Sequence, residues 1–248
     1  MRTPRIYLNQ DLKAALSRGS AISFDENAQR HVAQVLRLKP GSDITLFNGR
    51  EGEYTATLEL VSRRQVTACL KSFVSRSVES PLEITLLQGI SRGERMDYTL
   101  QKATELGVRR IVPLITERCG VHLNEERRNK RQQHWQGIII AACQQCGRNQ
   151  VPAIHSITPL TQWLTQTTEQ PPLRLVLAPD AEQGLKNLPP PTTGVELLIG
   201  PEGGLEGSEI ELAKRNGYQA VSIGPRILRT ETAGLAALAI LQSLWGDI

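Results

Sequence analysis

The first seventy or so residues alternate hydrophobic and polar positions over short runs, which is typical of half-buried β-strands. Three strands are predicted, at Ile44–Phe47, Tyr54–Leu58 and Gln65–Leu70. A short helix is expected over Glu26–Leu36, with its apolar side chains inward at Val32, Val35 and Leu36. Residues 1–72 are therefore predicted to form a small β-rich domain.

The pattern changes from Leu82 onward, where short apolar runs alternate with helical stretches. Strands are predicted at Ile84–Gln88, Ile111–Ile115, Leu173–Ala178, Val195–Ile199 and Ala220–Ile223. Helices are predicted at Glu94–Leu106, Asn124–Cys146, Ser208–Asn216 and Thr230–Trp245. This alternation predicts an α/β domain over residues 82–248, with a parallel sheet covered on both faces. Residues 73–81, which end in Pro81, are expected to be a linker.

Polar residues mark the ends of two of these helices. Asn124 is a candidate N-cap, and Ser208 with Glu211 matches a capping box in a helix that stops at Gly217. The last helix is apolar almost all round, which is typical of a buried helix. Either the core of one chain or a dimer interface would provide that burial.

Two strands of the second domain end in the same tripeptide, Ile-Gly-Pro. One continues as Ile199–Leu205 and the other as Ile223–Ala233, and a charged residue follows each proline. Parallel sheets bind ligands beyond the carboxyl ends of their strands. Glycine lets a ligand approach the backbone and proline stiffens the loop, so the pair suits a flat heterocycle and its ribose. The alternative is that both are ordinary tight turns.

Composition changes this picture only slightly. Lys and Arg number 29 against 25 Asp and Glu, a formal charge of +4, which permits an anionic partner such as RNA. The sequence has no Gly-x-Gly-x-x-Gly after a strand and no phosphate loop, which disfavours a Rossmann dehydrogenase and a phosphate-loop ATPase. The four cysteines suggest no disulfide framework, and no signal segment or membrane-length apolar run is found. A cytoplasmic protein without membrane contact is expected.

The two turn motifs, Leu198–Leu205 and Gly224–Ala233, resemble the signature of the RsmE family. These are small-subunit (16S) ribosomal RNA uridine-N3 methyltransferases of the SPOUT superfamily. Further stretches resemble the family at Pro4–Tyr7, Ser91–Asp97, Gln101–Gly107, Glu117–Gly120 and Ala141–Arg148, so the resemblance spans nearly the whole chain. It departs at Leu177–Asp180, where many members carry His and Glu near the end of the segment.

The resemblance implies a SPOUT-type α/β domain with a C-terminal trefoil knot that binds S-adenosylmethionine. It also implies a small N-terminal PUA-like β-barrel that binds RNA, and a homodimer without a metal. The substrate would be small-subunit ribosomal RNA or the assembled small ribosomal subunit. The residues expected to bind the cofactor are Leu177, Ile199, Gly200, Pro201, Glu202, Gly203, Ile223, Gly224, Leu228, Thr232 and Ala233.

Methylation of uridine N3 requires loss of the N3 proton and stabilisation of charge on the adjoining carbonyl oxygens. Arg229 is the candidate for the charge role, because its guanidinium stays protonated. Glu202 and Glu231 are candidate bases, or they offset the charges of the sulfonium and of Arg229. A structural ion pair is the alternative for Arg229. Candidate RNA contacts are the basic residues Arg5, Arg92, Arg95, Arg118 and Arg226.

Two other features are interpreted as structural. The basic run Arg127–Arg131 is expected to be a solvated helix face, with contact to RNA phosphates as the alternative. Cys143 and Cys146 form a Cys-x-x-Cys pair at the end of a helix, and a zinc site would require a second pair or nearby histidines. Packing is therefore expected for both cysteines.

Two further functional hypotheses stay open at this point. One is a non-catalytic RNA-binding protein with a PUA-like domain, whose cofactor site has decayed. Without the resemblance, the other is a nucleotide-binding α/β enzyme of unknown chemistry. The intact Gly-Pro turns and Arg229 argue against the decayed site.

Overall fold

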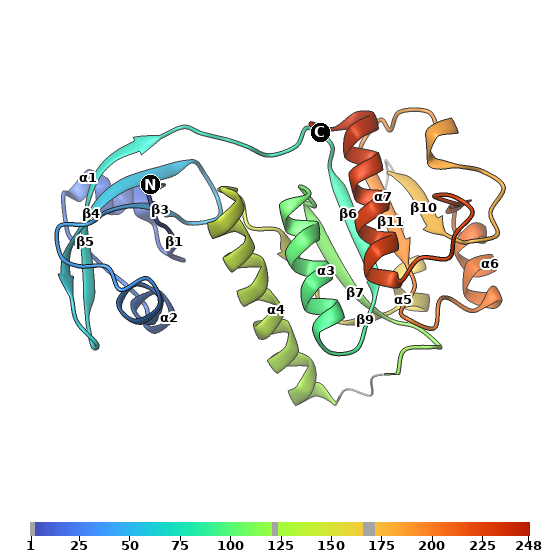
Figure 1. The fold of residues 1–248 in the computed structure, drawn as a ribbon, viewed down its shortest axis with the longest axis horizontal. Coiled ribbons are helices and arrows are strands. Elements are labelled where there is room, and N and C mark those ends of the chain that lie inside the picture. The colour runs from blue at the N-terminus through green and yellow to red at the C-terminus, as the bar shows by residue number, and fades with distance from the viewer. Residues whose placement is uncertain (1–2, 121–123, 166–171) are drawn as a thin grey trace. The chain divides into compact units, whose positions relative to one another are not determined.

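The computed structural model describes residues 3–120, 124–165 and 172–248 (Figure 1). The chain divides into two compact units. Unit 1 contains the described residues of Met1–Glu79 together with Cys143–Val151, and unit 2 contains those of Ser80–Ala142 and Pro152–Ile248. None of the described helices is long and apolar enough to cross a membrane.

Unit 1 is built on a five-stranded sheet in the order β1-β3-β4-β5-β2. Its strands are β1 (Arg5–Tyr7), β2 (Ile22–Ser23), β3 (Asp43–Phe47), β4 (Glu53–Val61) and β5 (Val66–Val74). The helices are α1 (Leu12–Arg18), α2 (Glu26–Arg30) and the π-helix η1 (His31–Val35). Alternate residues of β4 are buried, as the sequence pattern predicts for a half-buried strand.

The predicted helix Glu26–Leu36 is wrong in its second half. Val32 is buried as expected, but Val35 is 65% exposed and Leu36 is 37% exposed. From His31 the helix widens into a π-helix, and the N–H of Leu36 donates to the carbonyl of His31. The wider turn removes the 3.6-residue spacing that would have placed Val35 and Leu36 on the buried face.

Two findings change the predicted domain boundaries. Strand β5 continues to Val74, inside the predicted linker 73–81, because Ser72, Phe73 and Val74 pair with the beginning of β4. The segment Cys143–Val151 belongs to unit 1, although it follows the first unit-2 strands in the sequence. A prediction that assigns each domain one continuous segment cannot place residues 143–151 in the first domain.

Unit 2 has the predicted parallel sheet, in the order β12-β10-β11-β6-β7-β8, with β9 also paired to β7. Its strands are β6 (Ile84–Gly89), β7 (Arg110–Ile115), β8 (Ala153–Ile154), β9 (Thr158–Pro159), β10 (Leu173–Leu177), β11 (Val195–Ile199) and β12 (Gln219–Val221). Strand β6 is buried along its whole length, as expected for a sheet covered on both faces.

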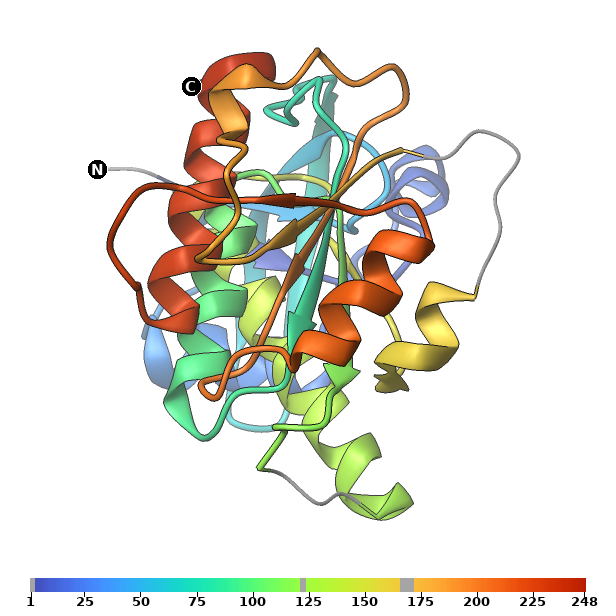
Figure 2. The ribbon, with the colours of Figure 1, turned by 90° about the vertical axis from the view of Figure 1, so that its right-hand side faces the viewer.

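Helices cover both faces of this sheet (Figure 2). Helices α3 (Glu94–Glu105) and α7 (Thr230–Trp245) pack together on one face. Helices α5 (Leu160–Leu164) and α6 (Gly207–Arg215) pack together on the other. The remaining helices are α4 (Glu125–Cys146) and the short 3-10 helix η2 (Leu185–Asn187).

The predicted end of α6 is confirmed, but its predicted beginning is wrong. The capping box is formed by Glu206 and Glu209, and Ser208 lies inside the first turn. The Glu209 carboxylate accepts a hydrogen bond from the N–H of Glu206 at 2.9 Å, which fixes the helix start at Gly207. Gly217, with a φ of +86°, follows the last residues of the helix as expected.

The predicted bounds of α7 are confirmed, but burial on all sides is not. Its buried residues are Thr230, Gly234, Ala237, Leu238, Leu241 and Gln242. The opposite apolar stripe is partly or fully exposed, at Leu235, Ala236, Ala239, Ile240 and Leu244. In unit 2 this helix therefore buries one side and leaves an apolar side in contact with solvent.

Candidate functional site

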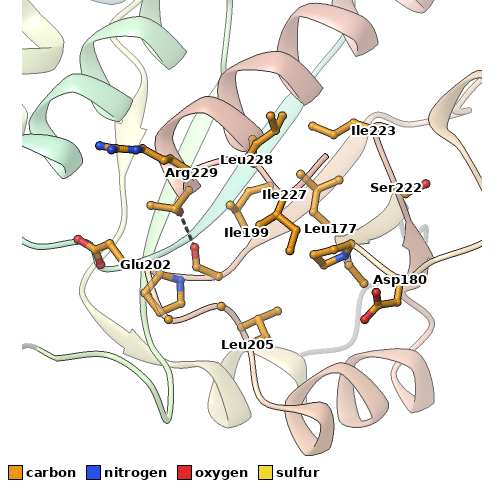
Figure 3. Close-up of a pocket in the computed structure, with 18 of the residues that line it drawn as sticks. Leu177, Asp180, Ile199, Glu202, Leu205, Ser222, Ile223, Ile227, Leu228 and Arg229 are labelled. Atoms are coloured by element: carbon orange, nitrogen blue, oxygen red, sulfur yellow. Dashed lines mark hydrogen bonds between the residues drawn. The ribbon is translucent and has the colours of Figure 1, made fainter. Parts of the chain in front are cut away.

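The loops that follow β10, β11 and β12 surround a cavity of about 660 Å³ at the carboxyl edge of the sheet (Figure 3). Apolar side chains from these three loops form its walls, at Leu177, Ile199, Leu205, Ile223, Ile227 and Leu228. This size and this lining are typical of a small-molecule site. The cavity lies where parallel sheets are expected to bind ligands.

Most of the sequence-predicted site residues line this cavity. Among the predicted cofactor-binding residues, all except Thr232 are in the lining. Thr232 is exposed on α7, because a helix turns by about 100° per residue and carries it away from the cavity-lining Glu231 and Ala233. Among the predicted RNA-contact residues, Arg95, Arg118 and Arg226 reach the cavity and Arg5 and Arg92 do not.

The first Gly-Pro turn is tightly enclosed. A Cβ atom on Gly89, at the end of β6, would lie 2.6 Å from the nitrogen of Pro201. A Cβ atom on Gly200 would lie 2.8 Å from the carbonyl carbon of Gly204, in the same loop. Gly204 has a φ of +70°, which favours glycine. The backbone of this turn therefore approaches β6 and its own second half too closely for a side chain.

Glu202 is held at the edge of the cavity as a paired carboxylate. It accepts hydrogen bonds from the backbone N–H of Arg92 at 2.8 Å and from the guanidinium of Arg95 at 3.0 Å. Burial raises the pKa of the Glu202 carboxyl, but these hydrogen bonds and the charge of Arg95 outweigh it, so the pKa lies below its usual value. A carboxylate stabilised in this way is a poor proton acceptor at neutral pH.

Arg118 stabilises the same loop from the end of β7. Its guanidinium pairs with Glu206 at 2.6 Å and donates to the carbonyl of Gly203 at 2.8 Å. Next to it, the N–H of Glu117 donates to Glu209 at 3.0 Å. Arg118, in the loop after β7, and Arg95, in the first turn of α3, thus both bind the segment 202–206.

Arg229 occupies the N-cap position of α7 and is exposed. In Figure 3 it lies at the same end of the cavity as Glu202, and Asp180 lies at the other end. The side chain of Arg229 has no hydrogen bond or ion pair with the part of the chain that the structure describes. Nearby, Glu231 is half-buried, and its Oε2 atom is enclosed without a hydrogen-bond partner among the described residues.

The structure does not support the predicted RNA contact of Arg5. This residue is only 8% exposed, and its guanidinium pairs with Glu53 and donates to Asn149 at 2.6 Å. It also donates to the carbonyl of Arg148 at 3.2 Å. The RNA contact was predicted because Arg5 lies in a family-like motif, whereas the structure shows it joining two segments inside unit 1.

The cysteine pair is consistent with packing. Cys143 is fully buried, and burial raises the pKa of its thiol to about 12, so it is not a thiolate at neutral pH. Its Sγ atom donates to the carbonyl of Gln150 at 3.7 Å. In the described ranges no group of three or more His, Cys, Asp and Glu side chains is placed to hold a metal ion.

Sequence reasoning missed several residues of the site. Pro179, Asp180, Ser222 and Thr230 line the cavity, and Gln88 lies behind the first Gly-Pro turn. One signal was available for Gln88 and Asp180. Each is a polar residue at or just beyond the carboxyl end of an apolar strand, the edge at which ligands bind.

Comparison with known proteins identifies the family. Residues 78–242 match the RNA methyltransferase domain family, and residues 24–68 match the RNA methyltransferase PUA domain family. Ribosomal RNA small subunit methyltransferase E of Buchnera aphidicola (Schizaphis graminum) is 34% identical, over 100% of this chain and 98% of that protein. The Bacillus subtilis enzyme of the same name is 27% identical, over 95% of each chain.

Solved structures agree with this assignment. Ribosomal RNA small subunit methyltransferase E from Neisseria gonorrhoeae, bound to S-adenosyl methionine, matches with a TM-score of 0.91 and 41% identity over 100% of both chains. A Legionella pneumophila protein in complex with its cofactor SAM matches with a TM-score of 0.93 and 42% identity, also over 100% of both chains. The chain therefore belongs to the ribosomal RNA small subunit methyltransferase E family, RsmE.

Proposed function

We propose that this chain transfers a methyl group from S-adenosylmethionine to N3 of one uridine in small-subunit ribosomal RNA. The observation that carries the proposal is Arg229, which lines a cavity formed by both Gly-Pro turns and whose side chain has no hydrogen bond or ion pair with the described residues. The similar Neisseria gonorrhoeae protein, whose structure contains S-adenosyl methionine, supports the choice of methyl donor.

The residues of the cavity fit that cofactor. Apolar side chains suit a flat adenine ring, and the first turn offers backbone groups with no side chain between them and a ligand. Glu231 has an enclosed carboxylate oxygen without a partner among the described residues, and a cationic ligand would compensate its charge. When bound, S-adenosylmethionine supplies an electrophilic methyl group.

The residues of the chain would act on the uracil ring. Arg229 stays protonated and can donate hydrogen bonds to a uracil carbonyl oxygen as negative charge develops there. The N3 proton must leave before or during transfer of the methyl group to N3. Glu202 is already stabilised by Arg92 and Arg95, so Glu231 is the better candidate to receive that proton.

RNA would be bound by both units. Residues 1–72 are proposed to form the RNA-binding domain, which the match of residues 24–68 to a PUA domain family supports. At the cavity, Arg226 is exposed and available for a phosphate. Arg95 and Arg118 are exposed but already paired with Glu202 and Glu206, so a phosphate would have to replace a carboxylate.

We also propose the knotted topology, a cytoplasmic location and a homodimer. The knot is supported by the strand order. After β11 the chain forms α6 and then β12, which pairs with the far side of β10 and not with β11. The dimer is supported by the apolar stripe of α7, which is partly exposed at Leu235, Ala236, Ala239 and Ile240 and exposed at Leu244, and which a second copy could cover.

A lysine in this stripe tests the dimer. Ile240→Lys is expected to convert a dimer into a monomer, because it would place a charge in an apolar interface. Analytical ultracentrifugation measures the mass of the species. Thr161→Lys adds the same charge at an exposed position of α5 and is expected to leave the dimer intact. A monomeric parent chain, or a dimeric Ile240→Lys variant, would contradict the proposal.

The reaction is tested on ribosomal RNA itself. Mass spectrometry of small-subunit RNA from cells with and without the gene is expected to show the loss of a single N3-methyluridine. The purified chain, incubated with S-adenosylmethionine and RNA from the deleted strain, should restore that nucleotide. Free RNA and assembled subunits are tested in parallel to identify the substrate. If the chain binds RNA but not S-adenosylmethionine in calorimetry, the non-catalytic alternative is correct.

A further inference from the structure

The carbonyl of Gly200, in the first Gly-Pro turn, is held by two buried side chains. The hydroxyl of Thr230 donates to it at 2.6 Å, and the amide of Gln88 donates to it at 3.4 Å. The same Gln88 amide donates to the Thr230 hydroxyl at 3.2 Å. Gln88 is fully buried and Thr230 is 8% exposed. These three groups come from the end of β6, the end of β11 and the beginning of α7.

This network fixes the orientation of the turn. Rotation of the Gly200 carbonyl would remove the acceptor of the buried Thr230 hydroxyl, whereas the Gln88 amide also donates to the carbonyl of Gly89 at 3.0 Å. Gly89 lies close to the same peptide, because a Cβ atom on it would be 2.6 Å from the nitrogen of Pro201 and 2.9 Å from the carbonyl carbon of Gly200. The Gly200–Pro201 peptide therefore has one available position against the sheet.

Thr230 also connects the turn to Arg229. It is the first residue of α7, and Arg229 is the N-cap immediately before it. Both Gly200 and Arg229 line the cavity. One hydrogen bond thus joins the loop that would cradle the methyl donor to the residue that would face the reacting base.

We propose that Thr230, supported by Gln88, is a positioning residue. It fixes the position of Arg229 relative to the first Gly-Pro turn. This inference rests on the proposed function of the cavity. Thr230 would touch neither the cofactor nor the uracil through its hydroxyl, because that hydroxyl is used by Gly200 and Gln88. Its effect would be transmitted through Gly200 and through the start of α7.

Thr230→Val and Thr230→Ser test the role of the hydroxyl. Valine keeps the shape of threonine and removes the hydroxyl, and serine keeps the hydroxyl. In calorimetry, Thr230→Val is expected to bind S-adenosylmethionine about tenfold more weakly than the parent chain, as for a lost hydrogen bond. Its kcat should also fall at saturating cofactor, because Arg229 is displaced. Thr230→Ser should stay within about twofold of the parent in both quantities.

Thr104→Val is the matched control. Thr104 is a buried threonine of the same unit, and its hydroxyl donates to the carbonyl of Leu100 inside α3, outside the cavity lining. This variant should lower the melting temperature without changing cofactor affinity. A purely structural Thr230 would behave in the same way. Two results would overturn this inference and leave the proposed function intact. One is parent-like affinity and kcat in Thr230→Val, and the other is equal losses in Thr230→Val and Thr230→Ser. A parent chain that does not bind S-adenosylmethionine would overturn the proposed function and the inference together.

Discussion

Arg229→Ala is expected to lower methyl transfer to ribosomal RNA by at least about a hundredfold, as does the loss of one oxyanion donor in other enzymes. Cofactor affinity should stay within about twofold, because the Arg229 side chain supports no other part of the described chain through a hydrogen bond or ion pair. Transfer of labelled methyl groups measures the first quantity and calorimetry with S-adenosylmethionine measures the second.

Two further substitutions separate charge from geometry. Arg229→Lys keeps the positive charge but loses the planar fork of donors, so it should recover only part of the activity. Arg215→Ala removes an exposed arginine at the end of α6, away from the cavity lining, and should leave turnover unchanged. Near-normal turnover by Arg229→Ala would contradict the proposed role of Arg229 in the reaction.

Gly89→Ala is expected to have the second largest effect, although residue 89 contributes no side chain to the cavity. A Cβ atom there would lie 2.6 Å from the nitrogen and 2.7 Å from the Cδ of Pro201, so the turn must move. A displacement of this kind costs about a hundredfold in turnover when it misplaces a reacting group by about 1 Å. Overpacking of this size should also lower the melting temperature by about 2–10 °C.

The control is a glycine with free space around it. Gly137 lies inside α4, and a Cβ atom there would meet nothing within 4 Å. Gly137→Ala should therefore stabilise the chain, by up to about 1 kcal/mol, because alanine is the better helix former. Turnover and melting temperature are measured for both variants. If Gly89→Ala bound cofactor and reacted like the parent chain, the first turn would tolerate displacement. The close approach of Gly89 to Pro201 would then not be needed for activity.

The parts of the fold that were predictable from the sequence are those determined by local chemistry. Apolar runs located β6, β7, β10, β11 and β12 of unit 2 but not the two-residue strands β8 and β9, and α7 begins and ends where predicted, at Thr230 and Trp245. The two Ile-Gly-Pro turns brought most of the predicted cofactor residues to one cavity. Local pattern and the rule for sheet edges located the two turns, and the resemblance to the RsmE family supplied the individual residues and the cofactor.

Several of the differences involve contacts between residues distant in sequence. Arg5 was predicted as an RNA contact, but it is 8% exposed and donates a hydrogen bond to Asn149 inside unit 1. Gln88 lies in none of the quoted motifs, and Thr230 lies in the Gly224–Ala233 motif without a predicted role; only the tertiary fold brings both to Gly200. The capping box of α6 was misplaced because Glu206 and Glu209 compete with Ser208 and Glu211 for the same role. Local sequence patterns predict candidate residues for a cap or a site, and tertiary contacts determine which of the candidates is used.

The return of Cys143–Val151 to unit 1 has a consequence for synthesis on the ribosome. Arg5 emerges early, but Asn149 and the carbonyl of Arg148 leave the ribosome only about 70 residues after Glu79. At translation rates of roughly 5–20 residues per second, the amino-terminal segment waits about 4–14 seconds for its last partners. During that interval Arg5 has its partner Glu53 but lacks its two hydrogen bonds to residues 148 and 149. A shortened gene for unit 1 would therefore have to encode Cys143–Val151 as well.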